Sequence, residues 1–253
     1  MFYPDFNFDL GFQQLGLSHV VFAVVRGMDQ QQTSFSEKYP KQLDAVEQFA
    51  LNVEEPQLET LQVLQGYVDL IRQIGRSPKK FPPSARALID IIKHRGKFPR
   101  ILPIVDIYNI ITLTYFLSFG VHDLSKLKGS SIQFRLSPGG EIFYPIGGGQ
   151  KNTAPGDYVY ADSHTVLAWL DARDSERVKV TSQTRDILIV VQGNLQTSLT
   201  YRMRALAATS TNLWRYGYVG TGGSHQRPVR LVAIKLIGIT LSRCLEMSWT
   251  KHL

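Results

Sequence analysis

The sequence predicts an α+β fold in which helices come first and strands follow. Apolar residues recur at helical spacing between residues 43 and 116, whereas residues 131–191 form short β-prone segments separated by turn residues. Helical and strand segments do not alternate along the chain, as they do in parallel α/β folds. We therefore expect N-terminal helices and a central buried helix packed on a mostly antiparallel sheet.

The elements on either side of the central helix follow from apolar spacing and stop signals. Before it we expect a buried strand over residues 19–27, a loop over residues 29–35, and helices over residues 43–50, over residues 58–71 up to Gly75, and from an N-cap at Ser84 to Gly96. After it we expect strands over residues 131–136, 141–146, 157–160, 165–170, 177–180 and 186–191.

The central helix lies within residues 97–127 and is the most apolar of the chain. Pro103 is expected just before it, Asp106 at its N-cap and Asn109 in its first turn. A buried helix start has free N–H groups that favour a carboxylate, a phosphate or a developing oxyanion. Asp106 and Asn109 therefore either cap the helix or contact a ligand. We favour a functional role for Asn109, because a better helix former would replace it if nothing needed its amide.

The composition indicates an ordinary globular protein without disulfides. With 253 residues, 43% of them apolar, the chain can form an ordinary core, and its single cysteine excludes an internal disulfide. The acidic start lacks the basic region of a secretory signal, and the apolar run at residues 231–241 is too short to cross a membrane. We expect a cytoplasmic protein that is not bound to a membrane.

No metal, cofactor or ATP is expected. The six histidines lack the spacing of metal ligands, and the glycines at residues 220–223 lack the GK[ST] ending of a phosphate-binding loop. Asp162, Ser163 and His164 are the residue types of a hydrolase triad, but adjacent positions between two strands cannot easily converge. We predict a turn there.

The net charge of +7 is confined to the C-terminal part of the chain. Residues 195–253 carry 8 basic and 1 acidic side chains, whereas the rest is balanced at 20 of each. A basic tail can follow a phosphate backbone, or it can be a solvated end. The loop at residues 76–86 has the same two interpretations, because Lys79 and Lys80 beside Phe81 suit either a nucleic-acid contact or a surface connector.

Three segments, taken in order, resemble a known family. PRILPIVDIYNIITLTYFLSFGVHDLSKL, PGDYVYAD and DSERVKVTSQTRDILIVVQGN resemble the B3/B4 domain, the editing domain of the phenylalanyl-tRNA synthetase beta subunit, which also occurs in freestanding proteins. The resemblance covers residues 18–194. It implies a domain over residues 1–194 that hydrolyses the ester of a misacylated aminoacyl-tRNA, followed by a poorly matched tail over residues 195–253. No sequence feature indicates an oligomeric state.

The resemblance also assigns residues. Asn109 matches the asparagine of the family pocket, and Asp123 matches the aspartate of an FDLDKL-like segment. The family histidine aligns with Gly120, so His122 is not its equivalent, although we keep His122 as a pocket candidate. The synthetase's glycine-rich segment is replaced by residues 169–177, which resemble the freestanding group; the candidates there are Trp169, Arg173, Asp174, Ser175 and Glu176.

Ester hydrolysis needs a positioned water and donors for the carbonyl oxyanion. Asn109 and the backbone of Gly147 and Gly148 are the candidates, although a flexible hairpin is an equal interpretation of this loop. Arg173 either faces a phosphate or the ester, or pairs with a neighbouring aspartate.

Asp123 either binds an amino group or caps a turn. Asp123, Asp171 and Asp174 would suit a cationic amino acid such as canavanine. Lys79, Lys80 and Arg100 are the expected tRNA contacts. A non-catalytic amino-acid or tRNA-binding module and a purely structural protein are the alternatives.

Overall fold

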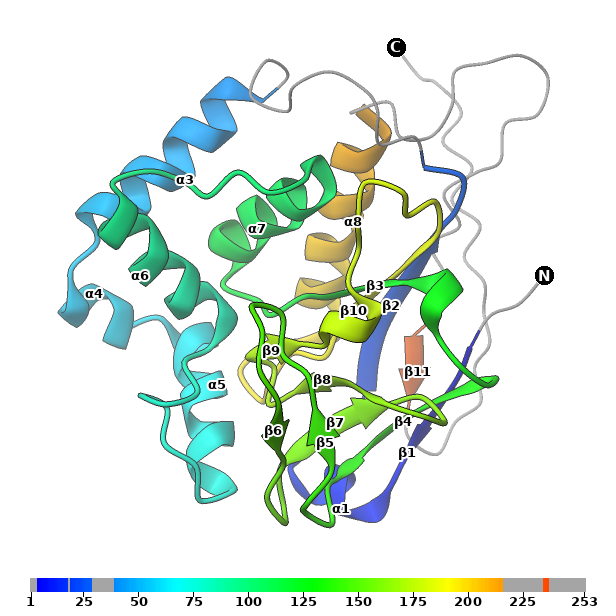
Figure 1. The fold of residues 1–253 in the computed structure, drawn as a ribbon. Helices are drawn as coiled ribbons and strands as arrows, with labels where there is room; N and C mark the ends of the chain where they lie inside the picture. Colours follow the sequence, from blue (N-terminus) through cyan, green and yellow to red (C-terminus); the bar gives the residue numbers. More distant parts are fainter. Residues whose placement is uncertain (1–3, 18, 29–38, 216–233, 237–253) are drawn as a thin grey trace.

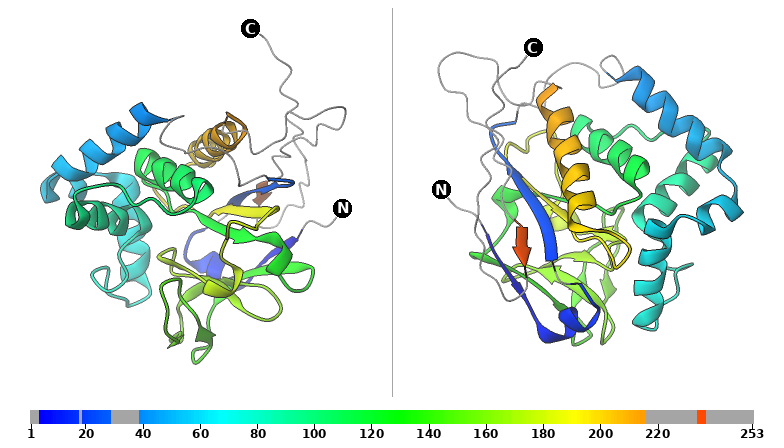
Figure 2. Two further views of the ribbon diagram at one scale, coloured as in Figure 1. Left: turned by 45° about the horizontal axis from the view of Figure 1, so that its top comes forward. Right: turned by 180° about the vertical axis from the view of Figure 1, so that it is seen from behind.

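The protein has three layers, with helices on one sheet and that sheet on a second one (Figures 1 and 2). The structure is a computed structural model and describes residues 4–17, 19–28, 39–215 and 234–236. The helices are α1 (Leu10–Gln14), α3 (Pro40–Asn52), α4 (Glu55–Glu59), α5 (Gln62–Gln73), α6 (Ser84–Arg95), α7 (Pro103–Tyr115) and α8 (Leu199–Arg215).

The strands form two main sheets and a small hairpin. The first sheet has the order β1 (Asp5–Phe8), β4 (Ser131–Leu136), β7 (Tyr158–Ala161), β8 (Val166–Trp169), β9 (Arg173–Asp174). The second has the order β11 (Ile234–Leu236), β2 (His19–Val25), β10 (Ile187–Val191), β3 (Gly120–Asp123). β5 (Ile142–Phe143) pairs with β6 (Lys151–Asn152), and of the described pairings only β1 with β4 is parallel.

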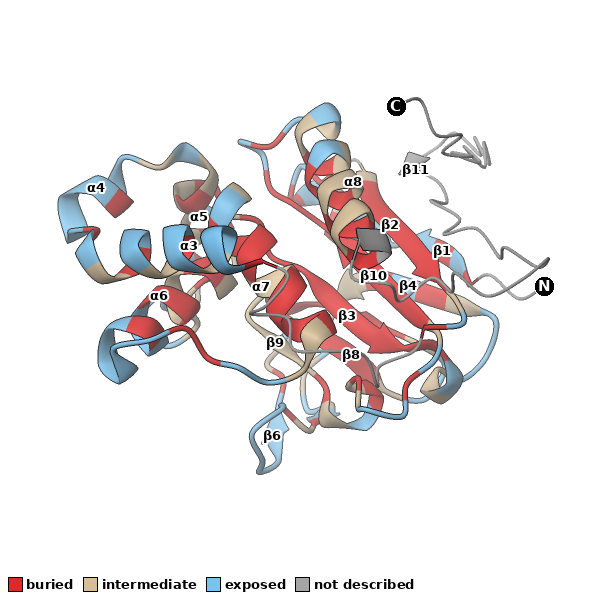
Figure 3. Cartoon of the chain, turned by 90° about the horizontal axis from the view of Figure 1, so that it is seen from above, coloured by how far each residue is buried: buried red, intermediate tan, exposed pale blue. Residues whose placement is uncertain are grey.

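The second sheet is buried on both faces, which explains its continuous β-branched strands. Along β2, Val21, Ala23 and Val25 pack against the helices, whereas Val20 and Phe22 pack against the first sheet. Figure 3 shows the strands of this middle layer buried, while α3, α4 and α6 expose their outer faces. The α+β class and the central buried helix are therefore confirmed, as is the strand expected over residues 19–27.

The helix boundaries differ from the prediction in three places. The helix expected over residues 58–71 is two helices, because the Thr60 hydroxyl donates to the Gln57 carbonyl where α4 ends. Ser84 is the first helical residue and not the cap, since its hydroxyl donates to the Asp171 carbonyl, 2.7 Å away. Pro103 lies inside α7 as its first residue, where its missing N–H costs nothing.

The strand prediction was wrong at residues 177–180. Glu176–Val178 form a 3-10 turn, because the Ser175 hydroxyl accepts a hydrogen bond from the Arg177 N–H. The elements α1, β1, β3, β6, β9 and β11 were not predicted. The loop expected over residues 29–35 and the glycines at 220–223 lie outside the described residues.

α8 lies within the expected tail and belongs to the same core. It packs on α7 and β2, and Ala205, Leu206 and Leu213 on it are buried among the helices. Arg202 is 2% exposed and donates to the main-chain carbonyls of His19, Gln192, Asn194 and Thr197. The sequence analysis did not predict this helix at residues 199–215, and the structure corrects it on this point. The domain boundary at residue 194 stays a prediction. Within the described chain, no helix is long and apolar enough to cross a membrane.

Candidate functional site

A pocket of about 330 Å³ lies between α6 and α7 on one side and the β8–β9 turn and the start of β3 on the other. α6 and α7 each present one face to it, because their lining positions recur at helical spacing: Ser84, Ala87, Leu88, Ile91 and Arg95 on α6, and Val105, Tyr108, Asn109 and Thr112 on α7. The volume is at the lower end of the range for small-molecule sites.

Asn109 lies in the pocket wall, as expected of a functional residue. It is half-buried and lies in the second turn of α7, not in the first as predicted, because the helix already begins at Pro103. Its amide makes no side-chain hydrogen bond within the described part of the chain. A free amide both donates and accepts, so it can fix the orientation of a bound ester or ribose.

Asp106 does not cap α7 and does not line the pocket. It is 2% exposed and lies inside the helix, whose N-cap is Leu102. Its carboxylate accepts hydrogen bonds from the Ile101 N–H at 2.9 Å and from Arg100 Nε at 2.7 Å. Burial raises its pKa, and these donors oppose the rise. The prediction of an N-cap was wrong because this side chain folds back to the loop before the helix.

Two aspartates, Asp171 and Asp174, line the pocket together with two arginines, Arg95 and Arg173. Burial raises the pKa of Asp171 to about 8, and the nearby charge of Asp174 contributes. Burial alone raises the pKa of Asp174 to about 7. Two enclosed carboxyls that hold a proton at neutral pH would release it to bind a cation. The Nε atom of Arg173 is buried without a hydrogen-bond partner in the described structure.

Asp171 is held by its neighbours in an unusual backbone conformation. Leu170 and Asp171 have φ values of 58° and 51°, a region that residues other than glycine rarely adopt. The Ser84 hydroxyl holds the Asp171 carbonyl, and Gln192 Nε2 donates to its carboxylate at 2.6 Å. Such strain gathers at binding sites, where surrounding contacts fix it.

Four other predicted residues lie outside the pocket lining and have structural partners. Trp169 Nε1 donates to Asp157 at 2.9 Å, Ser175 caps the 3-10 turn, and Glu176 pairs with Lys179. Asp123 accepts hydrogen bonds from both Ser125 groups and from the Thr184 hydroxyl, at 2.6 to 3.0 Å. Of the two interpretations of Asp123, these bonds favour the turn cap.

His122 and Gly120, from the same strand, occupy different places. His122 is fully buried behind the pocket, with its Nε2 atom 2.6 Å from the Tyr160 hydroxyl. Gly120 itself lines the pocket. Tyr160 also lines the pocket, but we did not predict it as a site residue, because the β-prone residues 158–161 fit an ordinary core strand.

Gly147 and Gly148 follow Ile146, which lies at the pocket mouth. Their φ values are 98° and 100°, and both residues are exposed. The Gly148 N–H donates to the Pro145 carbonyl at 3.1 Å, so it is used within the turn. This bond favours the hairpin interpretation at Gly148.

The basic candidates lie on the surface. Lys79 and Lys80 are exposed between α5 and α6, whereas Arg100 is exposed but bonded to Asp106. Phe81 packs edge-on against the Trp169 ring with 5.1 Å between centroids, so it is part of the connector and not a free stacking surface.

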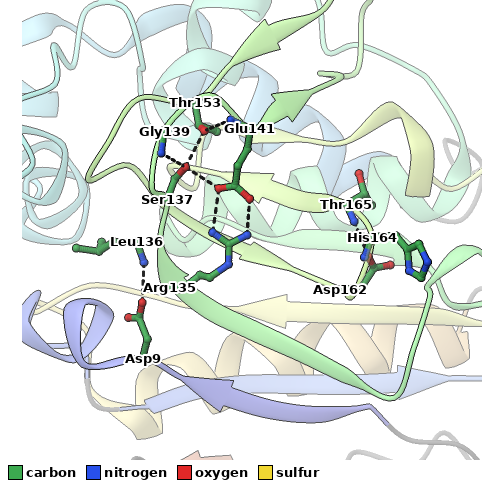
Figure 4. A network of polar contacts seen from close by, with 10 residues as sticks. All are labelled: Asp9, Arg135, Leu136, Ser137, Gly139, Glu141, Thr153, Asp162, His164 and Thr165. Atoms are coloured by element: carbon green, nitrogen blue, oxygen red, sulfur yellow. Dashed lines mark hydrogen bonds and ion pairs between the residues drawn. The ribbon is translucent and has the colours of Figure 1, made fainter.

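The triplet at residues 162–164 is a turn, as predicted. The Asp162 carboxylate accepts from the backbone N–H groups of Lys128, His164 and Thr165 and not from the imidazole. Figure 4 shows this turn at a distance from the Arg135–Glu141 ion pair. The Ser137 hydroxyl donates to Glu141 and lies within hydrogen-bond distance of the Thr153 hydroxyl, in the turn before β5. Among the described residues, no group of three or more His, Cys, Asp or Glu could hold a metal ion.

The fold and the pocket define an α+β domain whose helices α6 and α7 form, with the β8–β9 turn, a pocket lined by Asn109, two aspartates and two arginines. The chain belongs to the B3/4 domain family, whose model matches residues 67–218 and so spans every pocket-lining residue. This confirms the resemblance seen in the sequence.

One solved structure that the chain resembles is an N-terminal fragment of the phenylalanyl-tRNA synthetase beta-subunit from Pyrococcus horikoshii, with a TM-score of 0.43 and 15% sequence identity. The match covers 86% of this chain and 51% of that fragment, so the chain spans about half of the fragment's length. No curated protein matches the sequence.

Proposed function

We propose that the chain is a trans-editing hydrolase that deacylates a misacylated aminoacyl-tRNA. The observation that carries the proposal is the pocket itself, whose lining includes Asn109, with no side-chain hydrogen bond among the described residues, together with Asp171 and Asp174. A site for an aminoacyl ester needs these two features, because the ester and ribose oxygens bind neutral polar groups and the amino group is a cation.

The arrangement fits the reaction in the following way. The cationic group of the amino acid lies against Asp171 and Asp174, and Asn109 orients the ester. Water adds to the carbonyl carbon, the bond between that carbon and the ribose oxygen breaks, and the oxygen leaves with a proton as the tRNA hydroxyl. Main-chain donors and the neighbouring ribose hydroxyl assist. With one carboxyl for the amino group and one for a cationic side chain, Asp171 and Asp174 would suit a basic amino acid such as canavanine, although Arg95 and Arg173 line the same pocket.

The tRNA would approach over the open side of the pocket. Ile91, Ile101 and Ile146 line the pocket and are exposed, at 42%, 62% and 47%. Lys79 and Lys80 are the exposed cations proposed to contact the phosphate backbone.

A deacylation screen tests the proposal. The purified protein is incubated with tRNAs carrying cognate and non-cognate amino acids, including tyrosine on phenylalanine tRNA and canavanine on arginine tRNA. We expect rapid loss of one misacylated species, at least 10-fold slower with Asn109→Ala. Asn52→Ala, at an exposed asparagine on α3, is the matched control and should behave as wild type. No acceleration for any species, at protein concentrations that bind tRNA, would instead indicate a non-catalytic amino-acid or tRNA-binding module.

A further inference from the structure

The Tyr160 hydroxyl lies against the backbone of Gly120 in the pocket wall. A Cβ atom at position 120 would be 1.8 Å from this hydroxyl oxygen, so any side chain there would displace it. Gly120 does not have a positive φ, so the glycine serves to leave space and not to allow a special conformation. Glycine at position 120 thus leaves the space that the Tyr160 hydroxyl occupies in the pocket wall.

The partner of this hydroxyl is His122, and burial decides which of them donates. The His122 ring is 0% exposed, and its Nδ1 atom has no partner among the described residues. A buried N–H without an acceptor costs more free energy than an unused lone pair. The proton therefore lies on Nε2, which donates to the Tyr160 oxygen across 2.6 Å. Burial lowers the pKa of His122 to about 3, so the ring carries only this one proton.

This assignment leaves the proton of the Tyr160 hydroxyl free. Burial raises the pKa of Tyr160 well above its ordinary value, so the group stays protonated. A second hydroxyl without a partner belongs to Ser118, two residues before Gly120: its Oγ is buried and makes no hydrogen bond within the described structure, and the residue lines the pocket. Buried donors without partners in a pocket wall indicate a ligand oxygen.

We propose that Tyr160 is a substrate-contacting residue whose hydroxyl donates to the carbonyl oxygen of the aminoacyl ester, with His122 as its positioning residue. Ser118, whose buried hydroxyl has no partner in the described structure and which lines the same pocket, is a second donor available to the ligand. The inference rests on the proposed function. The Tyr160 hydrogen bond strengthens as negative charge develops on the carbonyl oxygen during water addition, and the carbonyl regains its double bond when the ribose oxygen leaves.

The tautomer can be tested without any substrate. In ¹⁵N spectra of the full chain, His122 is assigned by its loss in His122→Gln. We expect a protonated Nε2 and an unprotonated Nδ1 in the folded protein at pH 7. The opposite tautomer would direct the tyrosine proton toward His122 and overturn the inference.

Kinetics test the role in turnover. Tyr160→Phe should lower kcat about 100-fold and change KM by less than about 3-fold, because the lost donor acts mainly in the transition state. The ratio of wild-type to variant rate should stay constant from pH 6 to pH 8. Tyr201→Phe is the matched control, because it removes a hydroxyl that donates to the Tyr115 carbonyl outside the pocket. It should be as active as wild type.

The outcomes separate the two proposals. If Asn109→Ala loses activity and Tyr160→Phe does not, the inference fails while the deacylase proposal stands. If the wild type hydrolyses no ester, the deacylase proposal fails, and calorimetric binding of an amide-linked aminoacyl-adenosine decides the inference. At least 10-fold weaker binding by Tyr160→Phe would support it, and equal binding would overturn it.

Discussion

The Asp174 carboxyl should reduce the stability of the folded protein at neutral pH. Burial raises its pKa from 3.8 to about 7, so between these values the folded protein holds a proton that the unfolded chain has lost. Its contribution to stability is therefore fully present below pH 3.8 and is lost as the pH rises toward about 7. At about 1.4 kcal/mol per pH unit, the rise from pH 5 to pH 7 should cost the folded state about 2 kcal/mol.

Asp174→Asn removes the titration and keeps the shape of the side chain. In urea unfolding experiments, the free energy of unfolding of the variant minus that of wild type should grow by about 2 kcal/mol between pH 5 and pH 8. Asp69→Asn, at an exposed carboxylate on α5 that pairs with Arg72, controls for removing a surface charge and should change stability by less than about 0.5 kcal/mol. A difference between Asp174→Asn and wild type that does not vary with pH would refute the reasoning.

The remaining predictions concern packing and the excluded triad. Gly120→Ala should lower the melting temperature by at least about 5 °C in calorimetry, because the new methyl would lie 1.8 Å from the Tyr160 hydroxyl oxygen; an unchanged melting temperature would contradict that close contact. Arg202→Met should lower the free energy of unfolding by about 3 kcal/mol in urea, because four buried carbonyls lose their donor, and a loss below about 1 kcal/mol would mean that water replaces it. His164→Ala should leave deacylation unchanged, because its ring bonds only the neighbouring Ser163 hydroxyl, and a loss of turnover would restore the triad hypothesis.

The elements that the sequence predicted correctly are those whose cause is local. The strand at residues 19–25 follows from a continuous β-branched run, and Gly96 ends α6 with a φ of 69°. The errors come from partners distant in the sequence. The hydroxyl of Ser84 bonds Asp171, 87 residues away, and so does not cap α6. The helix at residues 199–215 was missed because its apolar face is weakly periodic, whereas Arg202 fixes it through hydrogen bonds to the carbonyls of His19 in β2 and of Gln192, just after β10.

The pocket shows the same division between local and distant causes. Asn109 was predictable, because an amide in an apolar helix needs a reason that the helix does not provide. The acidic pair was visible as residue types in the segment after β8, but the raised pKa values require burial, which only the packing of α6 and α7 over that segment supplies.

The sequence does not predict Tyr160 as a pocket residue, because its hydroxyl lies in the space that Gly120 leaves open by lacking a Cβ atom. A glycine inside a strand signals that something approaches its Cα closely, yet the sequence does not name the approaching group. The resemblance to the family places a histidine at position 120, and in this chain the Tyr160 hydroxyl occupies the space of that side chain's first atom. In the proposed reaction the polar group would thus come from β7 in place of β3, with His122 as its hydrogen-bond partner. Positions 120 and 160 therefore depend on each other sterically, and a histidine at position 120 would be compatible with the pocket only together with a smaller residue at position 160.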